Sequence, residues 1–229
     1  MMDHLALRYH LLSLAAYPEV KAVVLFGSRA KGTARADSDY DLAVQFSDES
    51  SKRWDEIEAI VAQAVMLPVD VVDMRCAVPE IAHAVNASSA IMFWQADWYP
   101  ALVRLAKAMA SLEDIINDED DPKHKQRDSV LSRFEYVFEL FWKLLQKMEA
   151  VEGFSEKSPR SAITRAVQLG WIENELLWSD MLQIRNLLSH TYNESLARKV
   201  FHDITAHFAE LKKAYDRVES IALNYIKVG

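Results

Sequence analysis

The pattern of apolar and polar positions changes near the middle of the chain. Up to about residue 95, short apolar segments alternate with polar, helix-like segments. This alternation is typical of a small unit that contains both strands and helices. Four strands are expected at 20–26, 39–46, 69–74 and 90–95, and helices are expected at 4–16, 51–65 and 78–85.

The remaining chain predicts helices only, since its apolar residues recur at steps of three and four. The expected helices cover 101–117, 123–150, 159–170, 173–190 and 201–225. Long helices joined by short loops favour an antiparallel bundle of four to five helices. The fold class is therefore α+β, with a small mixed-sheet domain over 1–97 and an all-α bundle over 98–229.

Composition and charge limit the ligands and the cellular location that we expect for the protein. The 229 residues carry a net charge of −8, of which −6 falls in residues 1–97, so a broad nucleic-acid-binding surface is disfavoured. The single cysteine, Cys76, allows no intrachain disulfide and no cysteine-based zinc cluster, which favours a cytoplasmic setting. We expect no signal peptide, because the first 20 residues carry an acid and histidines early and contain no long apolar core. We also expect no contact with a membrane, because no run of 18 uncharged apolar residues occurs.

A pair of aspartates follows the first expected strand. Asp39 and Asp41 are two residues apart, so within a strand their carboxylates would lie side by side and repel each other. A divalent cation relieves this repulsion, and Mg²⁺ is typically held by one or two carboxylates plus substrate phosphates. A third acid is available on the next expected strand, as Asp70 or Asp73; Asp70, which starts that strand, is the better candidate.

Two of the five glycines of the chain lie close together just before these aspartates. Gly27 follows the buried strand and would let the backbone approach a ligand closely, and Gly32 closes the same turn. Ser28 would begin a short helix, where free N–H groups and the hydroxyl can hold a phosphate. Together these parts predict a two-metal site for nucleotidyl transfer.

The arrangement Gly27-Ser28-x10-Asp39-x-Asp41 resembles the DNA polymerase β-like nucleotidyltransferase superfamily, and the size of the unit resembles its minimal nucleotidyltransferase branch (MNT). The resemblance covers about 20–95. It implies Mg²⁺ and a nucleoside triphosphate, usually ATP, with transfer of a nucleoside monophosphate and release of pyrophosphate. The candidate nucleotide-binding residues are Gly27, Ser28, Arg29 and Gly32, and the candidate catalytic and metal-binding residues are Asp39, Asp41 and Asp70.

A second group of candidate residues lies in RNLLSHTY, near the end of an expected helix. Arg185 and His190 are five residues apart, about 140° around a helix, and converge only if the helix ends near His190 or a second subunit closes the site. Arginine can bind phosphate and histidine can act as general acid or base, which suits RNA cleavage. Alternatively, both residues are ordinary features of a helix C-terminus.

Three segments, 132–146, 158–172 and 180–194, resemble the nucleotidyltransferase substrate-binding proteins, which belong to the wider HEPN group of helical bundles. This resemblance spans about 100–225 and implies an MNT unit fused to its usual partner. Many HEPN proteins with an R-x4-H motif are RNases. In toxin–antitoxin pairs the MNT protein can adenylylate the tyrosine of R-x4-H-x-Y, a position that Tyr192 occupies here.

Three functions remain open at this point. The first is a nucleotidyltransferase whose acceptor is a hydroxyl group, with Tyr192 of this chain or of another HEPN domain as one candidate. The second is a HEPN-type RNase toxin fused to its antitoxin, with RNA as its substrate. The third is a non-catalytic interaction module. The regular apolar positions over 201–225 favour a homodimer.

Overall fold

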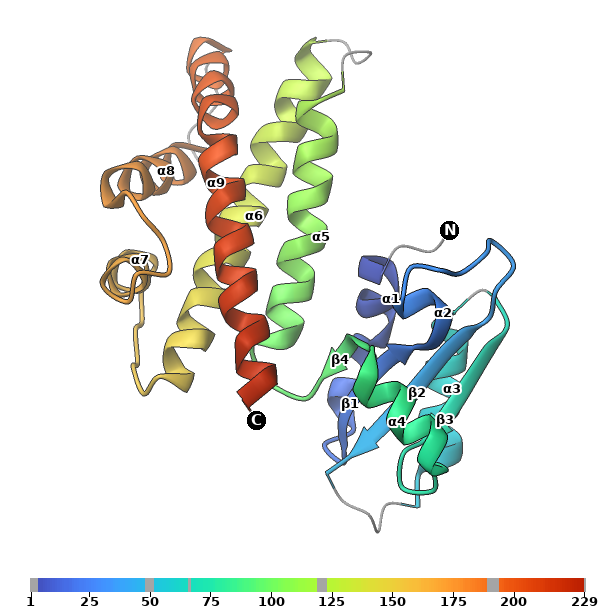
Figure 1. Ribbon diagram of the computed structural model, residues 1–229. Coiled ribbons are helices and arrows are strands. Elements are labelled where there is room, and N and C mark those ends of the chain that lie inside the picture. The colour runs from blue at the N-terminus through green and yellow to red at the C-terminus, as the bar shows by residue number, and fades with distance from the viewer. Residues whose placement is uncertain (1–3, 48–51, 66, 119–122, 189–193, 229) are drawn as a thin grey trace. The chain divides into compact units, whose positions relative to one another are not determined.

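The computed structural model describes residues 4–47, 52–65, 67–118, 123–188 and 194–228. The chain divides into two compact units, Met1–Val103 and Arg104–Gly229, and the division falls within helix α5 (Tyr99–Ile116). Figure 1 shows a sheet with helices in the first unit and helices alone in the second. The α+β fold class predicted from the alternating pattern is confirmed.

The first unit is built on a four-stranded mixed sheet in the order β3-β2-β1-β4. Its strands are β1 (Val20–Phe26), β2 (Tyr40–Phe46), β3 (Val69–Asp73) and β4 (Ala90–Trp94). Strand β1 pairs antiparallel with β2 and β4, whereas β2 and β3 run parallel. Parallel neighbours require a crossover, and helix α3 (Trp54–Gln63) provides it.

Both faces of this sheet are covered. Helix α4 (Pro79–Ala87) places Val85 against Val24, Phe26 and Ala43 on one face, in front of the sheet in Figure 1. Helix α3 lies behind the sheet and buries Ile57 and Val61. Burial on both faces explains why β1 is an almost continuous apolar segment rather than an alternating one.

The first expected helix differs from the structure in its second half. Residues His4–His10 form the α-helix α1, but Leu11–Ala16 form the 3-10 helix η1. Leu7, Leu11 and Leu14 are all fully buried. Leu7 on α1 is four residues from Leu11, whereas Leu11 and Leu14 on η1 are three apart, the spacing at which side chains of a 3-10 helix share a face.

The second unit contains α5, α6 (Lys123–Val151), α7 (Pro159–Gln168), α8 (Glu175–Leu188) and α9 (Glu194–Val228). Helix α7 begins as the sequence predicts, because Ser158 accepts a hydrogen bond from the Ser161 backbone and Pro159 occupies the first turn. The centre of the bundle is aromatic: Trp178 of α8 packs against Phe138 and Phe141 of α6.

The directions of the long helices add detail to the expected antiparallel bundle, because one pair of neighbouring helices is parallel. Helices α5 and α6 run in opposite directions, whereas α6 and α9 run in the same direction (Figure 1). The ion pair of Arg127 with Glu194 joins the starts of α6 and α9, and the Tyr225 hydroxyl donates to Glu152 near their ends, at 2.6 Å. The short helices α7 and α8 return the chain between them.

Glu149 on α6 is an unusual member of this core. Its side chain is fully buried, and neither carboxylate oxygen has a hydrogen-bond partner among the described residues. Burial, and then the neighbouring Glu156, raise the pKa of Glu149 from 4.5 to about 7, against a smaller lowering by Arg165. Glu149 therefore favours its neutral form in the folded protein at pH values below about 7.

Among the described helices, none combines the length and the apolar character needed to cross a membrane.

Replacing Glu149 tests this buried carboxyl group. Because the pKa of Glu149 is higher in the folded protein than in the unfolded chain, the folded state holds the extra proton. Stability should therefore fall as the pH rises from about 4.5 to 7, and stay reduced above pH 7. At pH 8, Glu149→Gln should raise the free energy of unfolding by up to about 3 kcal/mol.

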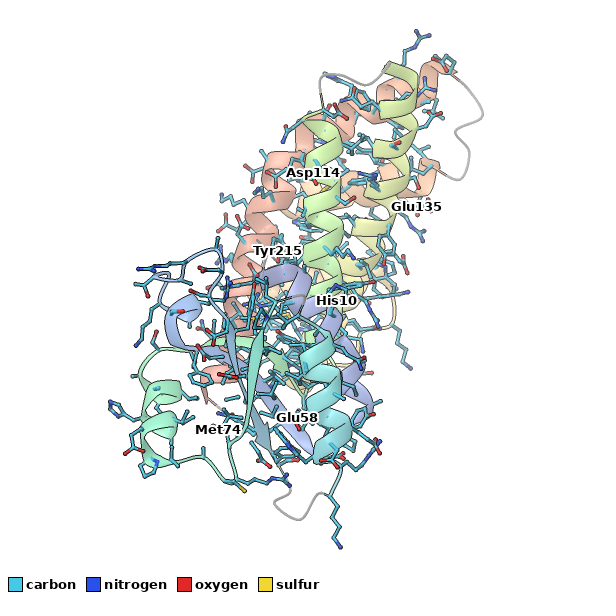
Figure 2. All side chains as sticks on the ribbon, turned by 90° about the vertical axis from the view of Figure 1, so that its right-hand side faces the viewer. His10, Glu58, Met74, Asp114, Glu135 and Tyr215 are labelled. Carbon is cyan, nitrogen blue, oxygen red and sulfur yellow. The ribbon has the colours of Figure 1, made fainter. Side chains whose placement is uncertain are left out.

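The measurement is urea unfolding at several pH values between 5 and 8. Glu135→Gln is the matched control, since Glu135 is exposed on the same helix (Figure 2). If wild type and Glu149→Gln show the same pH dependence, Glu149 is not neutral in the folded state.

Candidate functional site

The structure brings three carboxylates together at one end of the sheet. Asp41 on β2 lies directly opposite Asp70 in the parallel register of β2 and β3. Asp39 immediately precedes β2, two residues before Asp41, on the same side. One carboxylate oxygen from each of Asp39, Asp41 and Asp70 lies within 4.8 Å of the other two. We call these three residues the acidic triad.

Electrostatics in the triad favour a bound cation. Asp39 and Asp70 are exposed and Asp41 is half-buried. Burial raises the pKa of Asp41, and the charges of Asp39 and Asp70 raise it further. A divalent cation would relieve that repulsion, and three carboxylate oxygens are the hard donors that Mg²⁺ prefers. The triad is therefore consistent with a metal site.

Asp73, the alternative third acid, lies outside this cluster. Its carboxylate accepts hydrogen bonds from the Arg75 backbone at 2.9 Å and from Arg75 Nε at 3.0 Å. Burial acts to raise the pKa of Asp73, but the hydrogen bonds and charge of Arg75 outweigh it and lower that pKa. Asp73 is thus already compensated by a cation of the protein, whereas Asp70 faces two other carboxylates.

Helix α2 (Gly27–Ala30) lies directly against the triad. Gly27 has φ +70°, and a Cβ atom built on it would lie 2.0 Å from Asp41 Oδ2. Only glycine therefore fits both this backbone conformation and this contact. Gly32 also has a positive φ of +71°, but a Cβ there would meet no atom within 4 Å. Ser28 is half-buried in the same segment.

Arg29 is buried and contacts main-chain carbonyl groups of the same unit. It is only 8% exposed, and its Nε donates to the carbonyls of Ser38 at 3.1 Å and Asp39 at 3.0 Å. Its guanidinium also lies 4.1 Å from the centre of the Tyr40 ring. The sequence around Arg29 gives no signal of this burial, and the prediction that Arg29 contributes to nucleotide binding stays a prediction.

The second motif is described only in part. Arg185 lies on α8, which ends at Leu188, and His190 and Tyr192 fall outside the described residues. Arg185 Nη2 pairs with Glu139 Oε2 of α6 at 3.3 Å. Burial acts to raise the pKa of Glu139, but hydrogen bonds from Trp142 and Lys143 and the charges of Lys143 and Arg185 lower it. The charge of Arg185 is thus compensated within the bundle.

A cavity of about 420 Å³ lies where α6, α8 and α9 meet. Its charged lining residues within the described part of the chain are Arg127, Asp128, Glu135 and Glu194. Arg127 is 9% exposed and pairs with Asp128 at 2.9 Å and Glu194 at 2.6 Å. Among the described residues that line the cavity, three acids accompany one already paired arginine, a charge balance that disfavours a polyanion.

The two glycines of the α2 turn provide a matched pair of substitutions. Gly27→Ala and Gly32→Ala both place alanine at a positive φ, so each should lower the free energy of unfolding by about 1 kcal/mol. Only the first also displaces the Asp41 carboxylate, which is the mobile end of a side chain. Calorimetric Mn²⁺ binding should therefore weaken in Gly27→Ala and stay unchanged in Gly32→Ala. Equal Mn²⁺ affinities in the two variants would contradict this account of Gly27.

Comparison with known proteins assigns both units. Residues 101–220, just over half of the chain, match the family described as Nucleotidyltransferase substrate binding protein like. Residues 13–97 match the family described as Polymerase beta, Nucleotidyltransferase. No curated protein matches the chain.

Three solved structures show partial similarity. A protein of Thermus thermophilus, ttk003001694, is 35% identical, with 51% of this chain and 96% of that chain covered and a TM-score of 0.44. A toxin–antitoxin crystallised with AMP-PNP is 23% identical over 50% of this chain and 98% of that chain, with a TM-score of 0.34. A mutant of the toxin–antitoxin MntA-HpeT is 21% identical over the same shares, with a TM-score of 0.33.

These three TM-scores lie below 0.5, so the assignment of this chain depends on the two family matches and the fold described above. The chain belongs to the nucleotidyltransferase substrate binding protein like family, and its first unit is a nucleotidyltransferase domain of the polymerase beta type.

Proposed function

We propose that this protein is a Mg²⁺-dependent nucleotidyltransferase that transfers AMP from ATP to an acceptor hydroxyl group. The observation that carries this proposal is the acidic triad, whose carboxylate oxygens lie within 4.8 Å of one another on adjacent strands. The choice of ATP rests on resemblance to the family rather than on a contact in the site.

Each residue of the site has a role in this proposal. Asp39 and Asp41 hold Mg²⁺, and Gly27 and Ser28 bring backbone N–H groups to the triphosphate. Bound Mg²⁺ supplies Lewis-acid activation of the α-phosphate and neutralises charge on the triphosphate. Asp70 lies within the same cluster, where it can ligate Mg²⁺ or take the proton of the acceptor hydroxyl.

The proposed reaction is a displacement at the α-phosphorus of ATP. The acceptor oxygen forms a bond to that phosphorus, and the bond from the phosphorus to the oxygen that bridges to the β-phosphate breaks. Pyrophosphate leaves with the electron pair, and the proton of the acceptor hydroxyl passes to a carboxylate. The triad therefore supports the reaction in two ways. Its negative charge can hold the metal, and one of its carboxylates can accept the proton of the acceptor hydroxyl.

The acceptor that we propose for the first test is Tyr192, in the same chain or in a second copy. This assignment rests on the position of Tyr192 in RNLLSHTY. Two observations support nucleotidyl transfer over RNA cleavage as the function of the protein. Arg185 pairs with Glu139, and the described lining of the neighbouring cavity contains three acids and one paired arginine. Neither arrangement favours the phosphate chain of an RNA.

Removing one carboxylate of the triad tests the proposed reaction. The full chain is incubated with ATP and Mg²⁺, and both intact mass and pyrophosphate release are measured. Wild type should gain one adenylyl group, and Asp41→Asn should lose this reaction together with most of its Mn²⁺ affinity. Tyr192→Phe should lose the adduct but keep the metal affinity.

Asp37→Asn is the matched control, because Asp37 is an exposed acid close in sequence that lies outside the triad. It should behave as wild type does. A wild-type protein that releases no pyrophosphate and binds Mn²⁺ no better than Asp41→Asn would contradict the proposed function. An adduct on another residue would leave the reaction in place and replace Tyr192 as the acceptor.

A further inference from the structure

The three carboxylates of the triad are held in place by different means. Asp41 and Asp70 both belong to the β2–β3 ladder, which fixes their backbones. Asp39 does not, because β2 begins at Tyr40, whose N–H donates to the Pro68 carbonyl at 2.9 Å. The position of Asp39 therefore depends on interactions outside the sheet.

Arg29 supplies those interactions. Its guanidinium donates to the carbonyls of Ser38 and Asp39 and lies over the ring of Tyr40, so it contacts three consecutive residues with Asp39 in the middle. Among the described residues, Arg29 forms no ion pair, and main-chain carbonyls are its hydrogen-bond acceptors. A buried cation satisfied by carbonyl groups fixes the backbone that carries them.

We propose that Arg29 is a positioning residue that holds the Asp39 carboxylate in the triad. Helix α2 then organises two of the three aspartates: Gly27 leaves space for the Asp41 carboxylate, and Arg29 fastens the backbone at Asp39. This inference rests on the proposed function in one respect, the assignment of the triad as a metal site.

The shape of the arginine side chain distinguishes a positioning role from simple attraction of a charged ligand. The planar guanidinium can span two carbonyls while it stacks on the Tyr40 ring, whereas the lysine ammonium is a single point charge. If Arg29 served only to attract a triphosphate, Arg29→Lys would leave Mn²⁺ affinity in the absence of nucleotide unchanged. If Arg29 holds Asp39, Arg29→Lys should fail although the charge is unchanged.

The experiment measures Mn²⁺ affinity in the absence of nucleotide, by calorimetry or electron paramagnetic resonance. Arg29→Lys and Arg29→Gln should both weaken Mn²⁺ binding about tenfold or more, as loss of a group that supports a metal ligand does. Tyr40→Leu, which removes the stacked ring, should weaken it less. Tyr40→Phe keeps the ring and should bind as wild type does.

Arg8 offers a control for stability. Its Nε donates to the Ile91 carbonyl at 3.1 Å in the same unit, at a partly buried position. Arg8→Lys removes a comparable hydrogen bond that does not involve Asp39. It should lower the thermal midpoint by less than Arg29→Lys does, because Arg29 makes more contacts, and it should leave Mn²⁺ affinity unchanged. A loss of Mn²⁺ affinity in Arg8→Lys as large as that in Arg29→Lys would indicate a general effect of stability and overturn the proposal.

A double-mutant cycle keeps the proposal testable if Arg29→Gln does not fold. Because Arg29 is proposed to act through Asp39, Arg29→Lys should cause no further loss of Mn²⁺ affinity once Asp39→Asn is present. Additive losses would contradict this. If wild type binds Mn²⁺ better than Asp41→Asn while Arg29→Lys matches wild type, only the role of Arg29 fails. If wild type and Asp41→Asn bind Mn²⁺ alike, the metal site itself fails.

Discussion

The parallel pairing of β2 with β3 is the constraint on which the site depends. It sets Asp41 opposite Asp70, and Asp39 joins them from the residue before β2. Three carboxylates so close together repel one another without a compensating cation. Burial, and then the charges of Asp39 and Asp70, raise the pKa of Asp41. The rest of the unit supports this pairing: α3 makes the crossover, and buried apolar residues on both faces fix the register.

The second unit shows how a bundle can anchor the two helices that flank a candidate motif. On α6, Glu139 pairs with Arg185 near the end of α8, and Arg127 pairs with Glu194 at the start of α9. The charges are reversed between the two pairs, because α6 supplies the carboxylate in the first and the arginine in the second. Because α6 and α9 run in the same direction, their starts lie together, and the cavity of about 420 Å³ forms at this end. Glu149, near the other end of α6, is a buried carboxyl group that none of these functions uses.

Much of this could be predicted from the sequence, because the signals are local. The apolar segments indicated the strands, Ser158 and Pro159 marked the start of α7, and the spacing of Asp39 and Asp41 indicated paired carboxylates. The features that escaped prediction depend on contacts between distant segments. Nothing near Arg29 in the sequence shows that its guanidinium turns inward to the carbonyl groups before β2. The common direction of α6 and α9 follows from how α7 and α8 return the chain, and apolar periodicity carries no information on direction.

The most direct test of the central claim is to locate a bound cation by nuclear magnetic resonance, using Mn²⁺ as a paramagnetic substitute for Mg²⁺. At substoichiometric Mn²⁺, line broadening should begin at the amides of Gly27, Asp39, Asp41 and Asp70. The amide signals of Asp128 and Glu135, which line the acidic cavity of the second unit, should remain sharp. Broadening that spreads equally over all exposed acids, or that begins in the second unit, would contradict the assignment of the triad as the metal site.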